Sequence, residues 1–410
     1  MRKLIYTLVI IIILFHSDSF GQNMLFNSSD YLEEPYGCTA HIAFNNDKYG
    51  DYSCKDSLVL LAKKVGMTYI RFDFDPRCID VWDTVVNSIN KAELKPYIVL
   101  TSYHFDRKHL PWIDFVNYSR YLNASVIKYG NDITVWEIMN EVDLIYDNAD
   151  KIRKEIKLTT IGYTKILPEV VSFIRKYSAN SIISMGSVCR FESHFLNKLF
   201  NDRLFDYTDI LNIHIYSEPE KMVDKLYMIK SKMDKSNIRT NVWLTECGMP
   251  TNIDKSIPIT KEEMEIEQAR RVARIHLLSF AYGVEKVFWY NLRSLENDPY
   301  DKESHFGLLH RNLSPKPSYY AYKTMTTMCP NGSSRPKLLI KDGIYMCYWV
   351  RPDNKRIWAV WSIKELPMSK LKLKRVSSFY DYMGSKCKKP QNINNGVLYM
   401  VGDSRTMVYL

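Results

Sequence analysis

The stretch Ile133–Val142 reads ITVWEIMNEV and has the form of a buried strand that ends in polar residues. β-Branched and aromatic side chains fill its first half, which is typical of a core strand. Asn140 and Glu141 then follow at the point where such a strand meets solvent. A second stretch, Asn241–Gly248, reads NVWLTECG and ends in the same way, with Glu246 near its end. Two apolar runs therefore each deliver a carboxylate.

Two carboxylates that face each other across a pocket are the groups that glycoside hydrolysis requires. An isolated Asn-Glu after a strand is most often only a turn, so neither run suffices alone. Roughly a hundred residues separate Glu141 from Glu246, and three βα units of about 30 residues would fill that gap. In a parallel barrel the C-terminal strand ends carry the catalytic residues. The pair therefore favours catalysis.

Residues 136–141, WEIMNE, resemble the fourth-strand motif of the large clan of retaining glycoside hydrolases built on a (β/α)8 barrel. Residues 243–248, WLTECG, are similar to the seventh-strand motif of that clan. The resemblance covers roughly residues 37–323 and identifies no family within the clan, because cellulase-like, mannanase-like, xylosidase-like and galactanase-like families share these motifs. It implies that Glu246 is the nucleophile and Glu141 the general acid and base. No metal and no organic cofactor is implied.

Segments typical of strands and helices alternate along most of the chain. The expected strands are residues 37–42, 68–73, 96–101, 133–142, 181–188, 210–216, 241–248 and 285–291, and the expected helices are residues 56–65, 85–92, 114–129, 161–177, 221–233 and 262–282. Eight strands alternating with helices predict a parallel (β/α)8 TIM barrel. A doubly wound sheet would also alternate, but no glycine-rich phosphate loop follows the first strand.

Further strand ends carry residues to which the resemblance assigns roles. Arg71 matches the arginine that these enzymes place beneath the nucleophile, and an ion pair with Glu137 is a compatible structural alternative. Asn140 resembles the asparagine that binds the sugar 2-hydroxyl. His214 and Tyr216 form an His-x-Tyr pair, and in related enzymes such residues lie beside the two carboxylates. A lone histidine is as often structural.

Three aromatic residues complete the expected substrate-binding set. Trp289 resembles the platform tryptophan beneath the sugar at the point of cleavage, although tryptophan is also a good core residue. Tyr103 and His104 end the third strand and would line the cleft.

The two glutamates need different pKa values, because one must be charged and the other protonated. Arg71, Asp73 and Asp75 share one face of the second strand by alternation. A guanidinium near Glu246 would keep that carboxylate charged, and its charge is expected to raise the pKa of Glu141.

Residues 1–21 are expected to be a signal peptide. Arg2 and Lys3 precede the uncharged run 4–15, which is too short for a comfortable membrane span, and small residues at 19–21 suit cleavage after Gly21. An uncleaved anchor is the alternative. We therefore expect an exported protein, periplasmic or extracellular, with no membrane span in the mature chain.

The composition changes to that of a linker at residues 329–336, which read CPNGSSRP. From residue 337 short strands alternate with turns such as Asn394-Asn395-Gly396. We predict a catalytic barrel over residues 22–330 and a small β-sandwich over residues 337–410. The clan often carries such a domain without a catalytic role, and a carbohydrate-binding module is the functional alternative.

The net charge of +10 fits an anionic polysaccharide, but it also fits simple solubility. There is no long basic run and no nucleic-acid motif. The eight cysteines lack metal-ligand spacing, so no zinc site is predicted, while export would permit Cys38 to pair with Cys54 or Cys78. The expected partner is a polysaccharide or an oligosaccharide.

These features together favour a retaining glycoside hydrolase that cleaves β-glycosidic bonds by double displacement. One alternative is a catalytically inactive barrel that binds glycans within a surface or periplasmic complex. Another is an exported α/β hydrolase with a serine nucleophile, but the chain lacks a G-x-S-x-G elbow.

Overall fold

The structure is a computed structural model that describes residues 24–44, 51–101, 115–143, 153–254, 256 and 259–410. The expected signal peptide lies outside these residues, and so do Tyr103 and His104. Within the described ranges, no helix combines the length and the apolar character that crossing a membrane requires.

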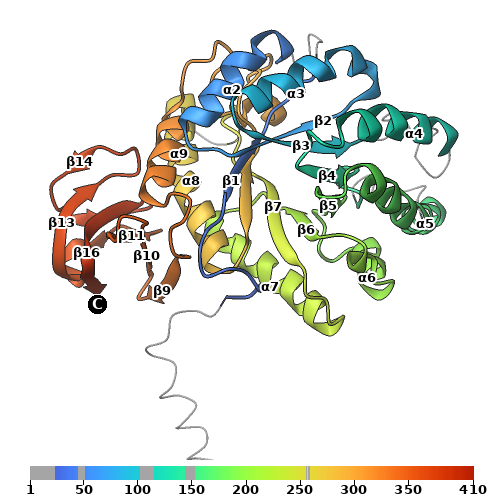
Figure 1. The fold of residues 1–410 in the computed structure, drawn as a ribbon. Helices are drawn as coiled ribbons and strands as arrows, with labels where there is room; N and C mark the ends of the chain where they lie inside the picture. The colour runs from blue at the N-terminus through green and yellow to red at the C-terminus, as the bar shows by residue number, and fades with distance from the viewer. Residues whose placement is uncertain (1–23, 45–50, 102–114, 144–152, 255, 257–258) are drawn as a thin grey trace, which may run out of the picture.

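Eight parallel strands close into a barrel in chain order, which confirms the predicted fold class (Figure 1). The strands are β1 (Tyr36–Thr39), β2 (Tyr69–Asp73), β3 (Lys95–Leu100), β4 (Val135–Ile138), β5 (Ile182–Met185), β6 (Ile210–His214), β7 (Asn241–Cys247) and β8 (Lys286–Trp289). The helices around them are α2 (Lys55–Lys64), α3 (Trp82–Lys91), α4 (Phe115–Leu122), α5 (Arg153–Tyr177), α6 (His194–Asn201), α7 (Pro219–Lys235), α8 (Lys261–Ala281) and α9 (Pro317–Met328).

Helix α6 was not predicted, although its sequence carries the signals of a helix. The hydroxyl of Ser193 caps its N-terminus by accepting a hydrogen bond from the backbone N–H of Leu196, 3.1 Å away. Phe195, Leu199 and Phe200 are buried on one face. The segment is only eight residues long, so its apolar periodicity spans about two turns and is easily overlooked.

A mainly aromatic cluster fills the N-terminal half of the barrel interior. Six strands contribute one side chain each, namely Tyr69, Tyr97, Val135, Ile210, Trp243 and Phe288. Trp243 and Phe288 stack with ring centroids 6.1 Å apart. Because this end of the barrel is packed with rings, the buried polar side chains collect at the opposite, C-terminal end of the strands, where catalytic residues lie in this fold.

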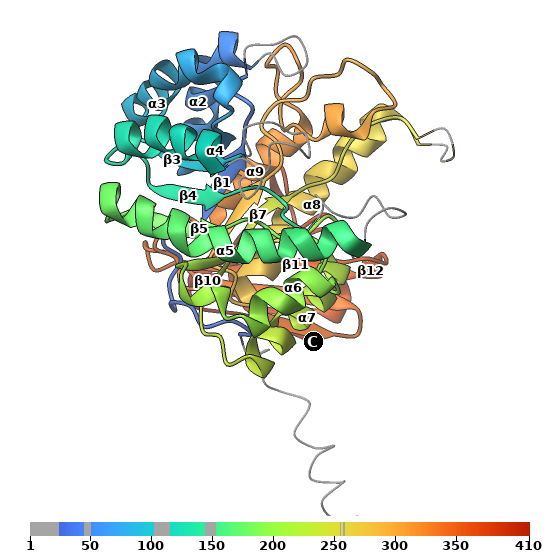
Figure 2. The same cartoon turned by 90° about the vertical axis from the view of Figure 1, so that its right-hand side faces the viewer.

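The C-terminal part of the chain forms an antiparallel β-domain beside α8 and α9 (Figures 1 and 2). Its six-stranded sheet has the order β14-β13-β16-β11-β10-β9, and β12 pairs with β15 in a small second sheet. The strands are β9 (Lys337–Lys341), β10 (Ile344–Val350), β11 (Arg356–Ser362), β12 (Leu366–Pro367), β13 (Lys372–Tyr380), β14 (Lys386–Cys387), β15 (Asn392–Ile393) and β16 (Leu398–Tyr409). The predicted sandwich therefore has one large and one small layer.

The two faces of the large sheet belong to different hydrophobic cores. On β10 and β11, Trp349 and Trp361 join the core of the barrel, whereas Met346 and Trp358 join a separate core inside the β-domain. This division follows from the alternation of side chains along a strand. All eight cysteines lie in the described part of the chain and all are free, so the disulfide considered for Cys38 does not form in this structure.

Replacing Trp349 with alanine is expected to destabilise the barrel and the β-domain together. Trp349 is 1 % exposed and its indole N–H donates to the carbonyl of Met328 at 2.8 Å, at the end of α9. Truncating a buried tryptophan costs about 3–5 kcal/mol of unfolding free energy. Urea denaturation, followed by fluorescence and by circular dichroism, should show one transition at a lower midpoint.

The matched control is Tyr409→Ala, at a side chain of the same sheet that is 43 % exposed. It should change the unfolding free energy by no more than about 0.5 kcal/mol. Two separate transitions for the Trp349 variant, with the barrel midpoint unmoved, would contradict a shared core.

Candidate active site

The chain turns sharply after β4 and so brings Glu141 over the barrel mouth. Met139 and Glu141 have φ angles of 71° and 42°, in the left-handed region. The turn is held by Ser187, whose hydroxyl oxygen accepts the backbone N–H of Glu141 at 2.8 Å. Gly186 makes this contact possible, because a Cβ there would lie 2.7 Å from the carbonyl oxygen of Ile138. Two residues with positive φ so close together mark a constrained turn, and such turns are held in place by their surroundings.

A β-bulge in β7 directs Glu246 into the same pocket. Ile213 pairs with Leu244, but the next residue of β6, His214, pairs with Glu246, so Thr245 is an extra residue in the ladder. Trp243 faces the barrel interior, and strict alternation from it would turn Glu246 outward. The bulge resets the alternation, which is a known way to re-aim a side chain beside an active site.

Arg71 lies at the centre of the site and joins the two sides of the pocket. Its Nε and Nη2 donate to the two carboxylate oxygens of Glu137, at 2.8 and 3.1 Å. Nη1 donates to Oε1 of Glu246 at 2.6 Å, and Nη2 also donates to Oδ1 of Asn140 at 2.6 Å. Both partners predicted for this arginine are thus present at once. Because Arg71, Glu137 and Glu246 are buried, removing any one of them would leave an uncompensated charge in the interior and destabilise the site.

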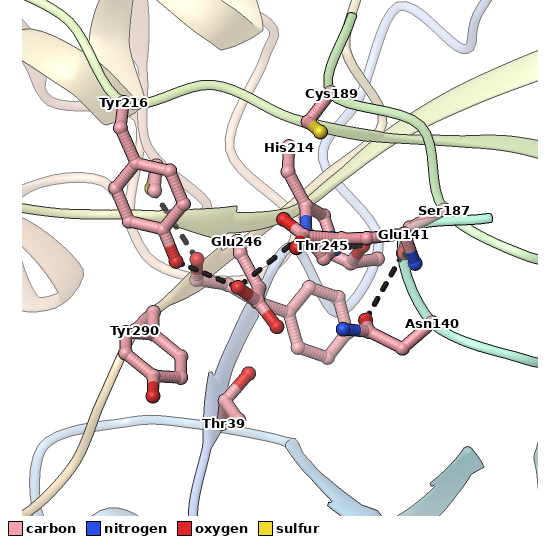
Figure 3. Close-up of polar contacts among 12 residues, drawn as sticks. Thr39, Asn140, Glu141, Ser187, Cys189, His214, Tyr216, Thr245, Glu246 and Tyr290 are labelled. Carbon is pink, nitrogen blue, oxygen red and sulfur yellow. Dashed lines mark hydrogen bonds and ion pairs between the residues drawn. The ribbon is translucent and has the colours of Figure 1, made fainter. Parts of the chain in front are cut away.

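Glu246 is held from two directions, as the sequence hypothesis expected for a nucleophile. Tyr216 donates its hydroxyl to Oε2 at 2.6 Å, opposite the contact of Arg71 with Oε1 (Figure 3). His214 lies between the two glutamates, with Nδ1 2.9 Å from Oε1 of Glu141 and 3.4 Å from Oε2 of Glu246. One carboxylate oxygen of each glutamate and a ring nitrogen of His214 all lie within 4.8 Å of one another.

A chain of hydrogen bonds fixes the tautomer of His214. Asn212 donates its amide N–H to the hydroxyl of Tyr97 at 3.0 Å, so its Oδ1 is the atom that accepts the hydroxyl proton of Thr245. Since that proton is given away, the oxygen of Thr245 accepts from Nε2–H of His214 at 3.1 Å. Nδ1 therefore shares one proton with Glu141. That proton lies on one partner of the pair at a time.

The surroundings of Glu141 shift the pKa of its carboxyl group in opposite directions. Burial raises the pKa of Glu141, but the hydrogen bond and charge of His214, with the charges of Arg71 and Arg190, outweigh burial and hold the pKa below its ordinary value. The expectation of a raised pKa was therefore wrong, because His214 rather than Glu246 is the nearest partner.

The two glutamates open into a pocket of about 570 Å³. Arg71, Asn140, Glu141, Tyr216 and Glu246 line it, together with Thr39, His41, Asp73, Tyr290 and Phe306. The first five of these lining residues were predicted from the sequence as site residues. His214, also predicted, is only 1 % exposed and supports them from beneath.

Trp289 does not line this pocket. It is fully buried, and its indole N–H donates to the carbonyl of Phe306 at 3.2 Å. Alternation along β8 explains the difference, since Phe288 faces the barrel interior and Tyr290 faces the pocket, so that Trp289 between them points outward into the helices. The platform role assigned to Trp289 was wrong, and Tyr290 occupies the pocket wall.

Two clusters of described residues have ligand types and spacing that suit a metal ion. The first is Glu141, His214 and Glu246, and the second is Glu265, Glu296 and His310. A cationic side chain already lies on each of them: Arg71 on Glu246 at 2.6 Å and Lys261 on Glu296 at 3.0 Å. In each cluster a lysine or arginine side chain thus supplies the positive charge that balances the carboxylates.

No family model matches the sequence, and no curated protein matches it. Among solved structures the chain is similar to a family 39 glycoside hydrolase from the gut symbiont Bacteroides cellulosilyticus WH2, with 19 % identity over 91 % of this chain and 82 % of that one and a TM-score of 0.68. It is also similar to a glucosidase from Croceicoccus marinus (10 % identity, 92 % and 97 % covered, TM-score 0.61). A third similar structure is a family 39 β-xylosidase from Caulobacter crescentus, with 12 % identity over 92 % of this chain and 98 % of that one and a TM-score of 0.55. At these identities the comparisons establish the fold, which is that of barrel glycoside hydrolases.

Proposed function

We propose that this chain is a retaining glycoside hydrolase that cleaves β-glycosidic bonds of a polysaccharide or oligosaccharide by double displacement. The observation that carries the proposal is the close approach of the two glutamates, each with a carboxylate oxygen within 4.8 Å of the other. Retaining enzymes hold their carboxyl groups about 5–5.5 Å apart, whereas inverting enzymes need about 6.5–9.5 Å to admit a water molecule. Export through residues 1–21 is part of this proposal.

In the first step Glu246 attacks the anomeric carbon. Arg71 and Tyr216 each bind one of its oxygens, so the carboxylate is charged and fixed in direction before substrate arrives. Asn140 accepts hydrogen bonds from Arg71 and Ser187 through Oδ1, and no described residue accepts from its Nδ2. This amide is available to the sugar 2-hydroxyl, the contact that strengthens in the transition state.

Glu141 protonates the departing oxygen in the same step. For this step Glu141 must hold the proton of its 2.9 Å hydrogen bond with Nδ1 of His214. A bound glycoside favours the protonated carboxyl group, because it displaces water from the carboxylate and so destabilises its charged form. After the aglycone leaves, Glu141 is again a carboxylate and removes a proton from the water that hydrolyses the glycosyl-enzyme.

The stereochemistry of the first product tests the mechanism. A panel of 4-nitrophenyl β-glycosides identifies a hydrolysed substrate, and proton NMR then records the anomer formed before mutarotation. The expected product has the β configuration of the substrate, because two displacements restore it. A first-formed α anomer would refute double displacement. Binding of glycans without any turnover would instead support the inactive, glycan-binding alternative.

A further inference from the structure

Asp73 is a pocket carboxylate that the proposed mechanism does not use. It ends β2, two residues after Arg71, and therefore projects from the same face of the strand. It lines the pocket with Glu246 and Tyr290 and is partly exposed there. In the described part of the chain no residue donates a hydrogen bond to it.

The reason that Asp73 lacks a donor lies in the saturation of Arg71. A guanidinium has five N–H groups. Those of Arg71 meet five acceptor atoms: two on Glu137 and one each on Glu246, Asn140 and Thr39. Asp73 is close enough to feel the charge of Arg71, yet no N–H is left for it. Its carboxyl group is thus free to bind a ligand.

The charge balance around Asp73 disfavours an anionic ligand. Arg71 is shared between two carboxylates, Glu137 and Glu246, so the pocket floor is already net negative without Asp73. Each cation that lines the pocket lies in an ion pair, since Arg271 contacts Glu218 at 2.7 Å and Lys302 contacts Glu303 at 3.6 Å. Among the described lining residues only the exposed Lys302 is loosely paired, so the buried floor of the pocket offers no unshared cation to a sugar carboxylate.

We propose that Asp73 binds a hydroxyl group of the sugar unit next to the nucleophile and restricts this position to uncharged sugars. The inference rests on the proposed function and adds the substrate class. Burial, with the charges of Glu246, Glu137 and Asp75, raises the pKa of Asp73 to about 7 against the opposing charge of Arg71. Near neutral pH the group therefore both donates and accepts hydrogen bonds, as a sugar hydroxyl requires. The carboxylate of a uronate placed beside Asp73 would add one more negative charge to those of Glu246, Glu137 and Asp75.

Two variants separate the two parts of the proposal. Asp73→Ala removes the hydrogen bond and the charge, whereas Asp73→Asn removes the charge but still offers one acceptor oxygen and an N–H donor. Both are compared with the unmodified chain on 4-nitrophenyl β-glucoside, β-xyloside and β-galactoside, on their 3-, 4- and 6-deoxy analogues where these exist, and on the β-glucuronide. Turnover gives kcat/KM, and calorimetric titration gives the affinity even without turnover.

For Asp73→Ala, kcat/KM on the preferred neutral glycoside should fall about 10–100-fold. One deoxy analogue should be equally poor for the unmodified chain and for this variant, because it already lacks the hydroxyl in question. For Asp73→Asn the fall on the neutral glycoside should be only about threefold, while activity on the glucuronide relative to it should rise about tenfold. On the neutral glycosides, where the pairing of Lys302 does not enter, Glu303→Gln, a loss of charge at an exposed pocket residue, should show no such dependence on a single hydroxyl.

A preference of the unmodified chain for the glucuronide would overturn the inference, as would an equal loss on every deoxy analogue. Circular dichroism checks that Asp73→Ala is folded, and Asp73→Asn carries the test if it is not. If the chain binds neutral glycosides but hydrolyses none, the proposed function fails and the affinities alone decide the role of Asp73. If it binds none of these glycosides, both fail.

Discussion

Replacing Glu246 with alanine is expected to abolish turnover of every glycoside. No leaving group compensates for the missing attack, so a dinitrophenyl glycoside should suffer as much as a natural one. We expect a loss on the order of 10⁵-fold in kcat, equivalent to ~7 kcal/mol of transition-state stabilisation. Stopped assays with concentrated enzyme would measure the residual rate.

Azide provides the test of the role itself. The space left by the Glu246 side chain is large enough for a small anion, and Arg71 and Tyr216 still present donors there. Azide should therefore restore turnover by a single displacement and give a glycosyl azide of inverted configuration. Glu303→Gln is the matched control, and azide should not change its product. A glycosyl azide of retained configuration from the Glu246 variant would contradict this assignment.

Replacing Glu141 with alanine should give a loss that depends on the leaving group. Proton transfer is worth about 10²–10⁴-fold, and substrates with poor leaving groups should lose that factor. A dinitrophenyl glycoside needs little protonation, so its first step should survive. The glycosyl-enzyme should then accumulate, because no base activates water, and mass spectrometry of the intact protein should detect it.

Azide should rescue the Glu141 variant with the opposite stereochemistry to the Glu246 variant. It needs no base, and it attacks the covalent intermediate to give a glycosyl azide of retained configuration. An inverted azide product here, with a retained one from the Glu246 variant, would show that the two roles are exchanged. An equal loss on all leaving groups would remove Glu141 from proton transfer altogether.

The barrel was predictable because its signals are local and repeated. Each strand is a short apolar run, and turns with a helix separate it from the next run. The expected strand 210–216 and the observed β6 (Ile210–His214) differ by two residues, which is typical of strand ends. Helix α6 has an apolar pattern, but the pattern covers only eight residues and was therefore missed.

Most of the site residues that the resemblance named do reach the site, but Trp289 does not, because backbone geometry decides which face of a strand a residue occupies. Glu141, Glu246, Arg71 and the His214–Tyr216 pair do converge. The bulge at Thr245 leaves no mark in the sequence, although it is what turns Glu246 inward.

Other residues of the site came to light only with the structure. Tyr290 was missed because alternation alone does not say which of two neighbouring residues faces inward: in the structure Phe288 and Tyr290 face inward, and Trp289 between them does not. Ser187, Asn212 and Thr245 could not be predicted, because each acts through a contact between strands that are distant in sequence.

The shared core between the barrel and the β-domain has a consequence for how such a protein evolves. Polar contacts also cross the boundary: besides the bond from Trp349 to Met328, Trp361 donates to Glu220 at 2.9 Å and Asn395 donates to Glu267 at 2.8 Å. A domain that recombines freely between genes needs a polar surface at its boundary, because that surface must remain stable in contact with water. Here an exchange would leave apolar surface of α8 and α9 facing an unmatched sheet, so the two parts should be inherited together and diverge as a pair.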